Sequence, residues 1–415
     1  MEMIVIAAIV VGFYMAWNIG ANDVANSMAC AVGSKAMTVF WAVVLAAACN
    51  FCGAVLVGSH VADTVRKGII DTQAFTNDPR MLAHGMLCAL LAAAVWLNLA
   101  SCFGMPVSTT HSIVGAVVGF GILEAGLRYV YWAKLGQIVA SWFISPLAGG
   151  IIAFVIFKLI LRYILSAEEP VRAARKGVPV CFFVVFTTII LAIIYRGLKN
   201  LHLDLSAPKA IAFSILGGLT AASISIFLDG RNRNCSGEVP VEQQLAQVER
   251  TFVVLVIISS CTVAFAQGAN DVANAIGPLA AVAEIVKTNA VPGAVQVDTR
   301  FLVLGGFGIA VGLATFGYRV MRLVGTKVTE ITPSRGVAAN LAGMMTVLTC
   351  SKMGLPVSTT HTMVGAILGV GLARGITAID RKVVKSIFAS WLATVPIAAG
   401  LTVLFYLIGK WLFWS

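Results

Sequence analysis

The sequence contains one seven-residue phrase twice, and its residue types could bind a small cation. Both copies, Gly20–Asn26 and Gly268–Asn274, read Gly-Ala-Asn-Asp-Val-Ala-Asn. Each lies in an apolar run long enough to enter a bilayer, where an ionisable residue is expensive and usually functional. Carboxylate, carboxamide and carbonyl oxygens are ligands that hard cations prefer. The candidate cation ligands are Asn22, Asp23, Asn26, Asn270, Asp271 and Asn274.

A second duplicated phrase could bind an anion. It reads Pro-Val-Ser-Thr-Thr-His and spans Pro106–His111 and Pro356–His361. Proline suits the first turn of a helix, where hydroxyls, free backbone N–H groups and the helix dipole all favour an anion. Donors from two copies would suit a tetrahedral oxyanion such as phosphate, although the hydroxyls could instead bond to neighbouring helices. The candidate anion ligands are Ser108, Thr109, Thr110, Ser358, Thr359 and Thr360.

The composition indicates that a polytopic membrane protein positions these phrases. Of the 415 residues, 59% are hydrophobic and 11% are charged, whereas a soluble domain has about 25% charged residues. The net charge of +11 fits basic cytoplasmic loops, and no basic run with interleaved aromatic residues indicates nucleic-acid binding. We predict an all-α fold with about twelve transmembrane segments. The expected spans lie near 3–27, 39–58, 81–103, 106–124, 136–160, 179–195, 208–228, 251–279, 301–318, 336–353, 356–373 and 386–412.

The duplication predicts two inverted repeats. With this set of spans, an odd number of crossings separates the two cation phrases, so they enter the membrane from opposite faces. The expected division is 1–165 for the first repeat, 166–250 for linking helices and a cytoplasmic loop, and 251–415 for the second repeat. The segments that open with the anion phrases are expected to be broken helices or hairpins at the central site. The GxxxG spacings of Gly115/Gly119 and Gly365/Gly369 predict close helix contacts.

The basic residues predict an orientation. Arginine and lysine collect in the expected loops after the fifth, seventh and ninth spans, which therefore lie in the cytoplasm. Both termini then lie outside, and the chain is expected in the cell membrane (plasma or inner). Arg66 and Lys67 fall on the outer side in this topology.

Taken together, these phrases resemble the inorganic phosphate transporter (PiT) family of cation–phosphate symporters. The two doubled phrases carry the resemblance, together with Asp63–Ile70 and Ile331–Gly336, and it covers the chain apart from 229–250. The resemblance implies that the six Asn and Asp residues bind coupling cations and that the six Ser and Thr residues bind phosphate. Asp63 and Asn340 replace a glutamate that is common in the family, and Arg322 is the basic counterpart of Asp63.

We therefore predict a secondary active transporter that imports inorganic phosphate with a cation, Na⁺ being favoured by the Asn-rich oxygen ligands. It is not expected to be an enzyme or to need a cofactor. A proton-coupled carrier of phosphate or metal phosphate and a sulfate carrier remain alternatives. An intramembrane aspartyl protease built on Asp23 and Asp271 is a remote alternative, because nothing in the sequence sets the geometry of such a dyad. The expected partners are phosphate, the cation and the bilayer, and homo-oligomerisation is left open.

Overall fold

The computed structural model describes residues 2–58, 69–196, 206–230, 240–291, 297–322, 324, 329–352, 357–375 and 379–413. In this part of the chain the fold is helical, with a single isolated β-bridge between Ile70 and Val130. Three short segments are 3-10 or π-helical: η2 (Thr72–Phe75), η3 (Leu127–Tyr129) and η4 (Leu161–Leu165). The α-helices are α1 (Glu2–Gly33), α2 (Val39–Val57), α4 (Pro79–Cys102), α5 (Thr109–Glu124), α6 (Trp132–Ile160), α7 (Pro170–Arg196), α8 (Ala207–Gly230), α9 (Val241–Thr288), α10 (Thr299–Phe316), α11 (Tyr318–Arg322), α12 (Pro333–Lys352), α13 (Thr359–Arg374) and α14 (Arg381–Phe413).

A helix occupies each span expected from the sequence, which confirms the prediction of an all-helical, multi-pass membrane protein. Among the described residues, nine helices are long and apolar enough to cross a membrane. The other three helices at expected spans are α5, α12 and α13. Because α5 has only 16 residues, it is shorter than the roughly 20 residues that a full crossing needs. Twelve complete crossings therefore remain a prediction.

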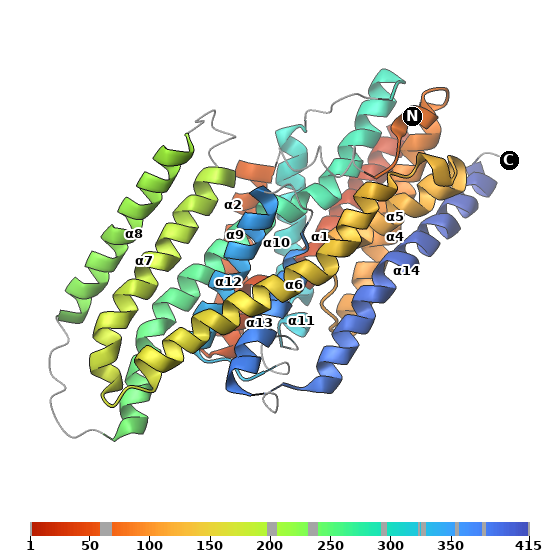
Figure 1. Cartoon of the computed structure of the whole chain (residues 1–415). Coiled ribbons are helices and arrows are strands. Elements are labelled where there is room, and N and C mark those ends of the chain that lie inside the picture. The colour runs from red at the N-terminus through yellow and green to blue at the C-terminus, as the bar shows by residue number, and fades with distance from the viewer. Residues whose placement is uncertain are drawn as a thin grey trace.

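Helices α1 and α9, which carry the cation phrases, pack against each other and run in opposite directions (Figure 1). Gly12, early in α1, faces Leu279, late in α9. Further along α1, Asp23 meets Gln267, which lies earlier in α9. Inverted repeats require this antiparallel pairing. Both helices are unbroken through the phrase.

The interruption in the first half lies between α4 and α5. Gly85, near the start of α4, packs against Phe120, near the end of α5. The two helices are therefore antiparallel and form a hairpin, with the segment 103–108 as its connection. In the second half, the consecutive helices α12 and α13 also pack against each other. Residues 353–356 of their connection lie outside the described part of the chain.

The glycine pairs predicted to form close helix contacts do so, and they join the two halves of the chain. Gly115 of α5 lies against Val395 of α14, and Gly119 lies one turn further along, against Ala399. Their counterparts, Gly365 and Gly369 of α13, lie in the same way against Pro146 and Gly150 of α6. Helices α5 and α13 therefore each pack on a long helix of the other half.

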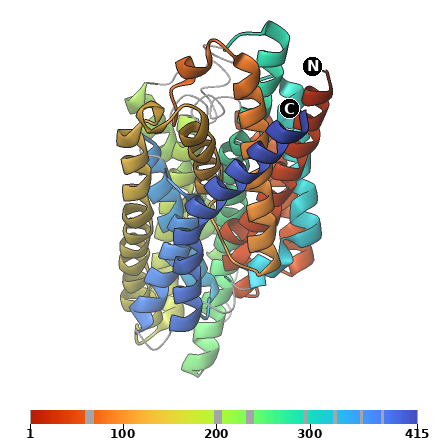
Figure 2. The same cartoon turned by 90° about the vertical axis from the view of Figure 1, so that its right-hand side faces the viewer.

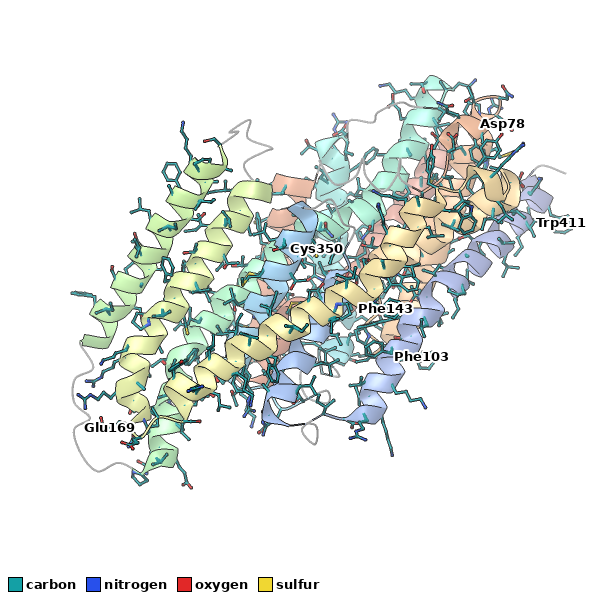
Figure 3. The ribbon with its side chains drawn as sticks, viewed as in Figure 1. Asp78, Phe103, Phe143, Glu169, Cys350 and Trp411 are labelled. Atoms are coloured by element: carbon teal, nitrogen blue, oxygen red, sulfur yellow. The ribbon has the colours of Figure 1, made fainter. Side chains whose placement is uncertain are left out.

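Both termini lie at one end of the bundle (Figures 1 and 2). Asp78 and Trp411 lie at this end, whereas Glu169, in the connection between α6 and α7, lies at the other (Figure 3). The helices α7 and α8 pack against each other along one side of the bundle. The buried side chains form two apolar clusters, one of which includes the α4–α5 hairpin and the other α13 and much of α12.

Candidate functional site

The two anion phrases begin helices, as their proline, serine and threonine residues predict. Ser108 is the N-cap of α5, where its Oγ accepts a hydrogen bond from His111 N at 3.2 Å. Ser358 caps α13 through the same bond to His361 N, also at 3.2 Å. Serine is a favoured N-cap because its oxygen satisfies a free N–H of the first turn. The first N–H groups of each helix remain available, with the positive end of the dipole, to an anion.

The cation phrase of each half is hydrogen-bonded to the anion phrase of the other half. From α1, Asn26 Nδ2 donates to Thr360 Oγ1 of α13 at 2.9 Å. From α9, Asn274 Nδ2 donates to Thr109 Oγ1 and Thr110 Oγ1 of α5, both at 3.2 Å. The structure thus brings both copies of the cation phrase and both copies of the anion phrase together between the halves.

Asp23 lies at the centre of these contacts. Its Oδ1 accepts from Asn26 Nδ2 at 3.0 Å and from Thr360 Oγ1 at 3.2 Å, and Thr109 also lies within reach of the carboxylate. Its Oδ2 is buried and has no hydrogen-bond partner among the described residues, and the same holds for Asn26 Oδ1. Burying an acceptor without a partner is costly, and burying a charge costs far more. A cation bound by these two oxygens would remove that cost.

Asp271 lies close enough to Asp23 for their carboxyl groups to interact electrostatically. Its Oδ1 accepts from Asn270 Nδ2 at 3.0 Å, and its side chain is 1% exposed. Two buried carboxylates repel each other unless a proton or a cation lies near them. The structure therefore places the two Asp residues of the duplicated phrase close together in the interior, and their role as cation ligands stays a prediction.

Asn22 binds the first hairpin. Its Nδ2 donates to Ser101 Oγ and to Met105 O, both at 3.0 Å, and its Oδ1 accepts from Val107 N at 3.0 Å. These bonds hold the α4–α5 connection, including Val107 of the first anion phrase, against α1. Among the remaining predicted ligands, Thr359 is half-buried and makes no such bond to the other half within the described residues.

The histidines of the anion phrases meet between α5 and α13. The ring centroids of His111 and His361 lie 4.8 Å apart, with the rings edge to face. Trp142 of α6 flanks the first ring at 5.1 Å, and Trp391 of α14 stacks on the second at 3.7 Å. Both histidines are buried. They pack the two anion phrases against each other.

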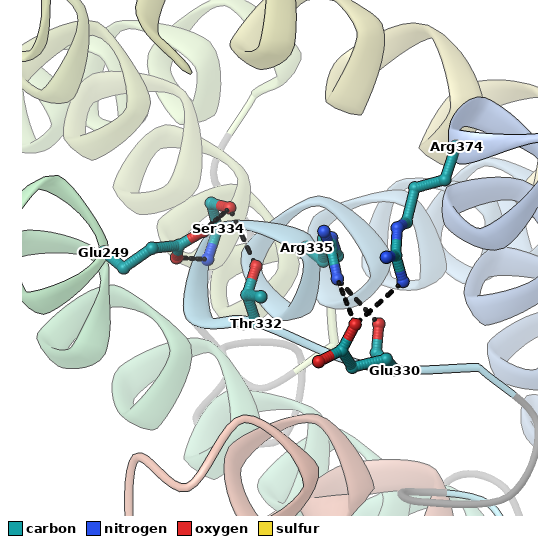
Figure 4. Close-up of polar contacts among 6 residues, drawn as sticks. All are labelled: Glu249, Glu330, Thr332, Ser334, Arg335 and Arg374. Atoms are coloured by element: carbon teal, nitrogen blue, oxygen red, sulfur yellow. Dashed lines mark hydrogen bonds and ion pairs between the residues drawn. The ribbon is translucent and has the colours of Figure 1, made fainter. Parts of the chain in front are cut away.

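The phrase Ile331–Gly336 joins the start of α12 to α9. Ser334 donates through its N to Glu249 Oε2 at 2.8 Å and through its Oγ to Glu249 Oε1 at 2.7 Å (Figure 4). Nearby, Glu330 Oε2 pairs with Arg335 at 3.6 Å and with Arg374 at 3.1 Å. These contacts fix the start of α12 to α9, and they link it through Glu330 to the end of α13.

Of the positions that depart from the family's pattern, only Asn340 has a described side chain, and it makes none of these contacts. Asn340 is fully buried and donates through Nδ2 to Ser259 Oγ at 3.0 Å and to Ser260 Oγ at 2.9 Å. Asp63 and the side chain of Arg322 lie outside the described part of the chain.

Two residues of this site were missed by the sequence analysis. Ser101 holds Asn22, and nothing in its apolar helix marks it. Gln267 donates through Nε2 to the backbone oxygen of Asp23 at 2.8 Å. Gln267 could have been identified from the sequence, because it is a polar residue directly before the second cation phrase.

Comparison with known proteins places the whole chain in one family. A family model described as the phosphate transporter family matches residues 19–402. The chain is 42% identical to "Inorganic phosphate transporter 2-1, chloroplastic" of Arabidopsis thaliana, over 98% of this chain and 72% of that protein. It is 44% identical to "Putative phosphate permease TK2061" of Thermococcus kodakarensis, over 96% of each chain. The solved structure named "The sodium-dependent phosphate transporter" matches with a TM-score of 0.88 and 40% identity, covering 99% of this chain and 100% of that one.

These relatives are transporters and permeases, not enzymes, which confirms the expectation that the chain is not an enzyme. The match extends over almost all of the chain and includes both copies of the cation phrase and both copies of the anion phrase. This chain therefore belongs to the phosphate transporter family.

Proposed function

We propose that this protein is a secondary active transporter that imports inorganic phosphate with Na⁺. The observation that carries the proposal is the pair of contacts between halves, Asn26 with Thr360 and Asn274 with Thr109. Each contact joins a candidate cation ligand to a candidate phosphate ligand. A movement of one of these side chains therefore alters its hydrogen bond to the other. Coupled transport needs such a link.

The hydroxyl of Thr360 suggests how binding is coupled. It donates to Asp23 Oδ1 at 3.2 Å, and Val107 O is an alternative acceptor at 3.3 Å. A cation bound to Asp23 would compete with this hydroxyl for the carboxylate oxygen. The released O–H would then be free to donate to phosphate. Cation binding thereby prepares a donor for the anion, and the bound anion in turn neutralises the positive charge.

Na⁺ is proposed as the coupling ion because the site offers neutral amide and hydroxyl oxygens around its carboxylates. A similar protein of known structure is named a sodium-dependent phosphate transporter. Phosphate is proposed over sulfate because phosphate can donate a proton to a carboxylate near neutral pH. Coupling to protons, with phosphate or metal phosphate as cargo, is the alternative that the experiment must separate.

For the architecture, we propose inverted repeats at 1–165 and 251–415, joined by the helices and loop of 166–250. Rocking one repeat against the other would open the central site to each side in turn. We place both termini outside the cell membrane, because the basic residues Arg172, Arg175 and Lys176 lie at the start of α7.

The test is uptake of labelled phosphate into proteoliposomes that hold the full chain. We expect uptake to follow an inward Na⁺ gradient and to fall to background when choline replaces Na⁺. A pH gradient alone should not drive it, and excess sulfate should not compete. Uptake driven equally well by a pH gradient without Na⁺ would reject Na⁺ coupling. Inhibition of phosphate uptake by an equal concentration of sulfate would reject phosphate selectivity.

A further inference from the structure

The two cation phrases are identical, but the residue directly before them is not. The first copy is preceded by Ile19 and the second by Gln267. Both side chains are buried, with 1% of Ile19 and 2% of Gln267 exposed. One half of the site therefore has a buried amide where the other half has a hydrocarbon. Any role for this amide makes the two halves of the site chemically different.

The contact with Asp23 fixes the orientation of the Gln267 amide. Nε2 lies 2.8 Å from the backbone oxygen of Asp23. A backbone oxygen only accepts hydrogen bonds, so the nitrogen must face it and the two ends of the amide cannot be exchanged. Oε1 therefore points away from this bond. It is buried and has no hydrogen-bond partner among the described residues.

Gln267 Oε1 is not the only buried oxygen of this kind on α1 and α9. Asp23 Oδ2 and Asn26 Oδ1 belong to the stretch of α1 that Gln267 contacts, and they also lack a hydrogen-bond partner among the described residues. Gln267 also lies four residues before Asp271, so the two side chains share a face of α9. All three atoms are acceptors, and none has a donor. A buried group of acceptors from two helices suits a bound cation, since a hydrogen-bonded core would supply donors to them.

We propose that Gln267 Oε1 is a ligand of one coupling cation, together with Asp23 and Asn26, and that the two cation sites are therefore unequal. The inference rests on the Na⁺ coupling proposed above. The site with Gln267 has an amide oxygen that the site around Asp271 and Asn274 lacks, because Ile19 occupies the equivalent position. It binds Na⁺ more tightly and fills first.

The test compares Gln267→Met with Ile19→Met in the full-length protein. Both variants place the same flexible apolar side chain at equivalent positions, but only the first removes an oxygen. Two measurements are made: Na⁺-dependent thermal stabilisation of purified protein without phosphate, and the Na⁺ dependence of phosphate uptake. We expect Gln267→Met to raise the Na⁺ concentration for half-maximal effect roughly tenfold or more in both, since one lost ligand contact is worth about that factor. Ile19→Met should match wild type.

Gln267→Glu separates the oxygen from the amide donor. Glutamate keeps an oxygen for the cation but cannot donate to Asp23 O when ionised. If Oε1 is a ligand, this variant keeps wild-type or tighter Na⁺ binding. If Gln267 only holds α1 and α9 together, folded Gln267→Glu loses Na⁺ binding as Gln267→Met does, and the proposal is overturned. Should Gln267→Met not fold, Gln267→Glu decides alone by the same two outcomes.

The failure of this inference differs from the failure of the proposed function. Wild-type protein that shows neither Na⁺ stabilisation nor Na⁺-driven uptake would overturn both. Wild-type protein that shows both effects, with Gln267→Met indistinguishable from Ile19→Met, would overturn only the role of Gln267.

Discussion

Asn26 and Thr360 are separated by 334 residues, and Asn26 Nδ2 donates to Thr360 Oγ1 at 2.9 Å. Asn26 belongs to the first cation phrase and Thr360 to the second anion phrase. The bond therefore links the two kinds of ligand across the two halves of the chain. If a cation and phosphate bind at these residues, each changes the affinity for the other by the same factor, because a coupling free energy between sites is reciprocal.

Thr360→Val should weaken phosphate binding. Valine keeps the shape of threonine but removes the hydroxyl that contacts Asn26 and Asp23. Loss of one such contact costs about 1–3 kcal/mol, so the apparent affinity for phosphate should fall roughly tenfold to a hundredfold. Thr109→Val should act in the same way from the other half. The measurement is the phosphate concentration for half-maximal uptake at saturating Na⁺.

Thr362→Val is the matched control for Thr360→Val. Thr362 lies on the same helix and is also buried, but its hydroxyl donates only to Ser358 O within α13, at 2.9 Å. Its removal should leave phosphate affinity near the wild-type value. If Thr360→Val and Thr109→Val bind phosphate as tightly as the control, these hydroxyls serve helix packing and do not bind phosphate.

Asp23→Asn should abolish Na⁺-driven uptake while the protein remains folded in detergent. Asparagine has nearly the same shape but carries no charge, and its Nδ2 replaces one carboxylate oxygen that could bind the cation. Asp271→Asn should have the same effect. The control is Asp78→Asn, because Asp78 caps α4 at the exposed end of the bundle, and asparagine caps a helix equally well. Wild-type uptake in both site variants would end their assignment as cation ligands.

The sequence predicted which segments are helices better than it predicted where they end. The span expected at 251–279 is part of α9, which runs from Val241 to Thr288. The span expected at 179–195 is part of α7, which begins at Pro170. Hydropathy changes where a helix leaves the apolar region, whereas the helix itself continues into polar surroundings. The segment 166–250, expected to end in a cytoplasmic loop, is therefore helical again from Val241 onwards.

The residue types of the site were predictable from the sequence, but its contacts were not. The duplicated phrases marked Asp23 and Thr360, since polar residues are rare in apolar spans. Nothing in them showed that Asn26 would reach the anion phrase of the other half. Asn22 has the same type as Asn26 and one turn of helix separates them, yet Asn22 holds the α4–α5 connection. Only the packing of the hairpins distinguishes these two roles.

Gly20→Ala should destabilise the protein. A methyl group at Gly20 would overlap the carbonyl oxygen of Ile309 in α10, because the two backbones are in contact there. Neither helix can move without disturbing the site, so we expect a loss of about 1–3 kcal/mol or more. The control is Gly400→Ala on α14, where a methyl group would meet nothing within 4 Å. Thermal unfolding in detergent should show a lower midpoint for Gly20→Ala only, and equal midpoints would contradict the close contact.

The proposed inversion of the repeats can be tested with single cysteines. Ser34 directly follows α1, and Lys287 is exposed in the last turn of α9. Because α1 and α9 are antiparallel, these equivalent ends should lie on opposite faces of the membrane. The native cysteines must be replaced first, since Cys30 lies one turn from Ser34. In sealed vesicles of one orientation, a membrane-impermeant maleimide should label Ser34→Cys or Lys287→Cys, but not both, until the vesicles are opened. Labelling of both positions from the same face would mean that the repeats are parallel. The shared site and the rocking motion would then both fail, because a two-fold axis in the membrane plane could no longer relate the two halves.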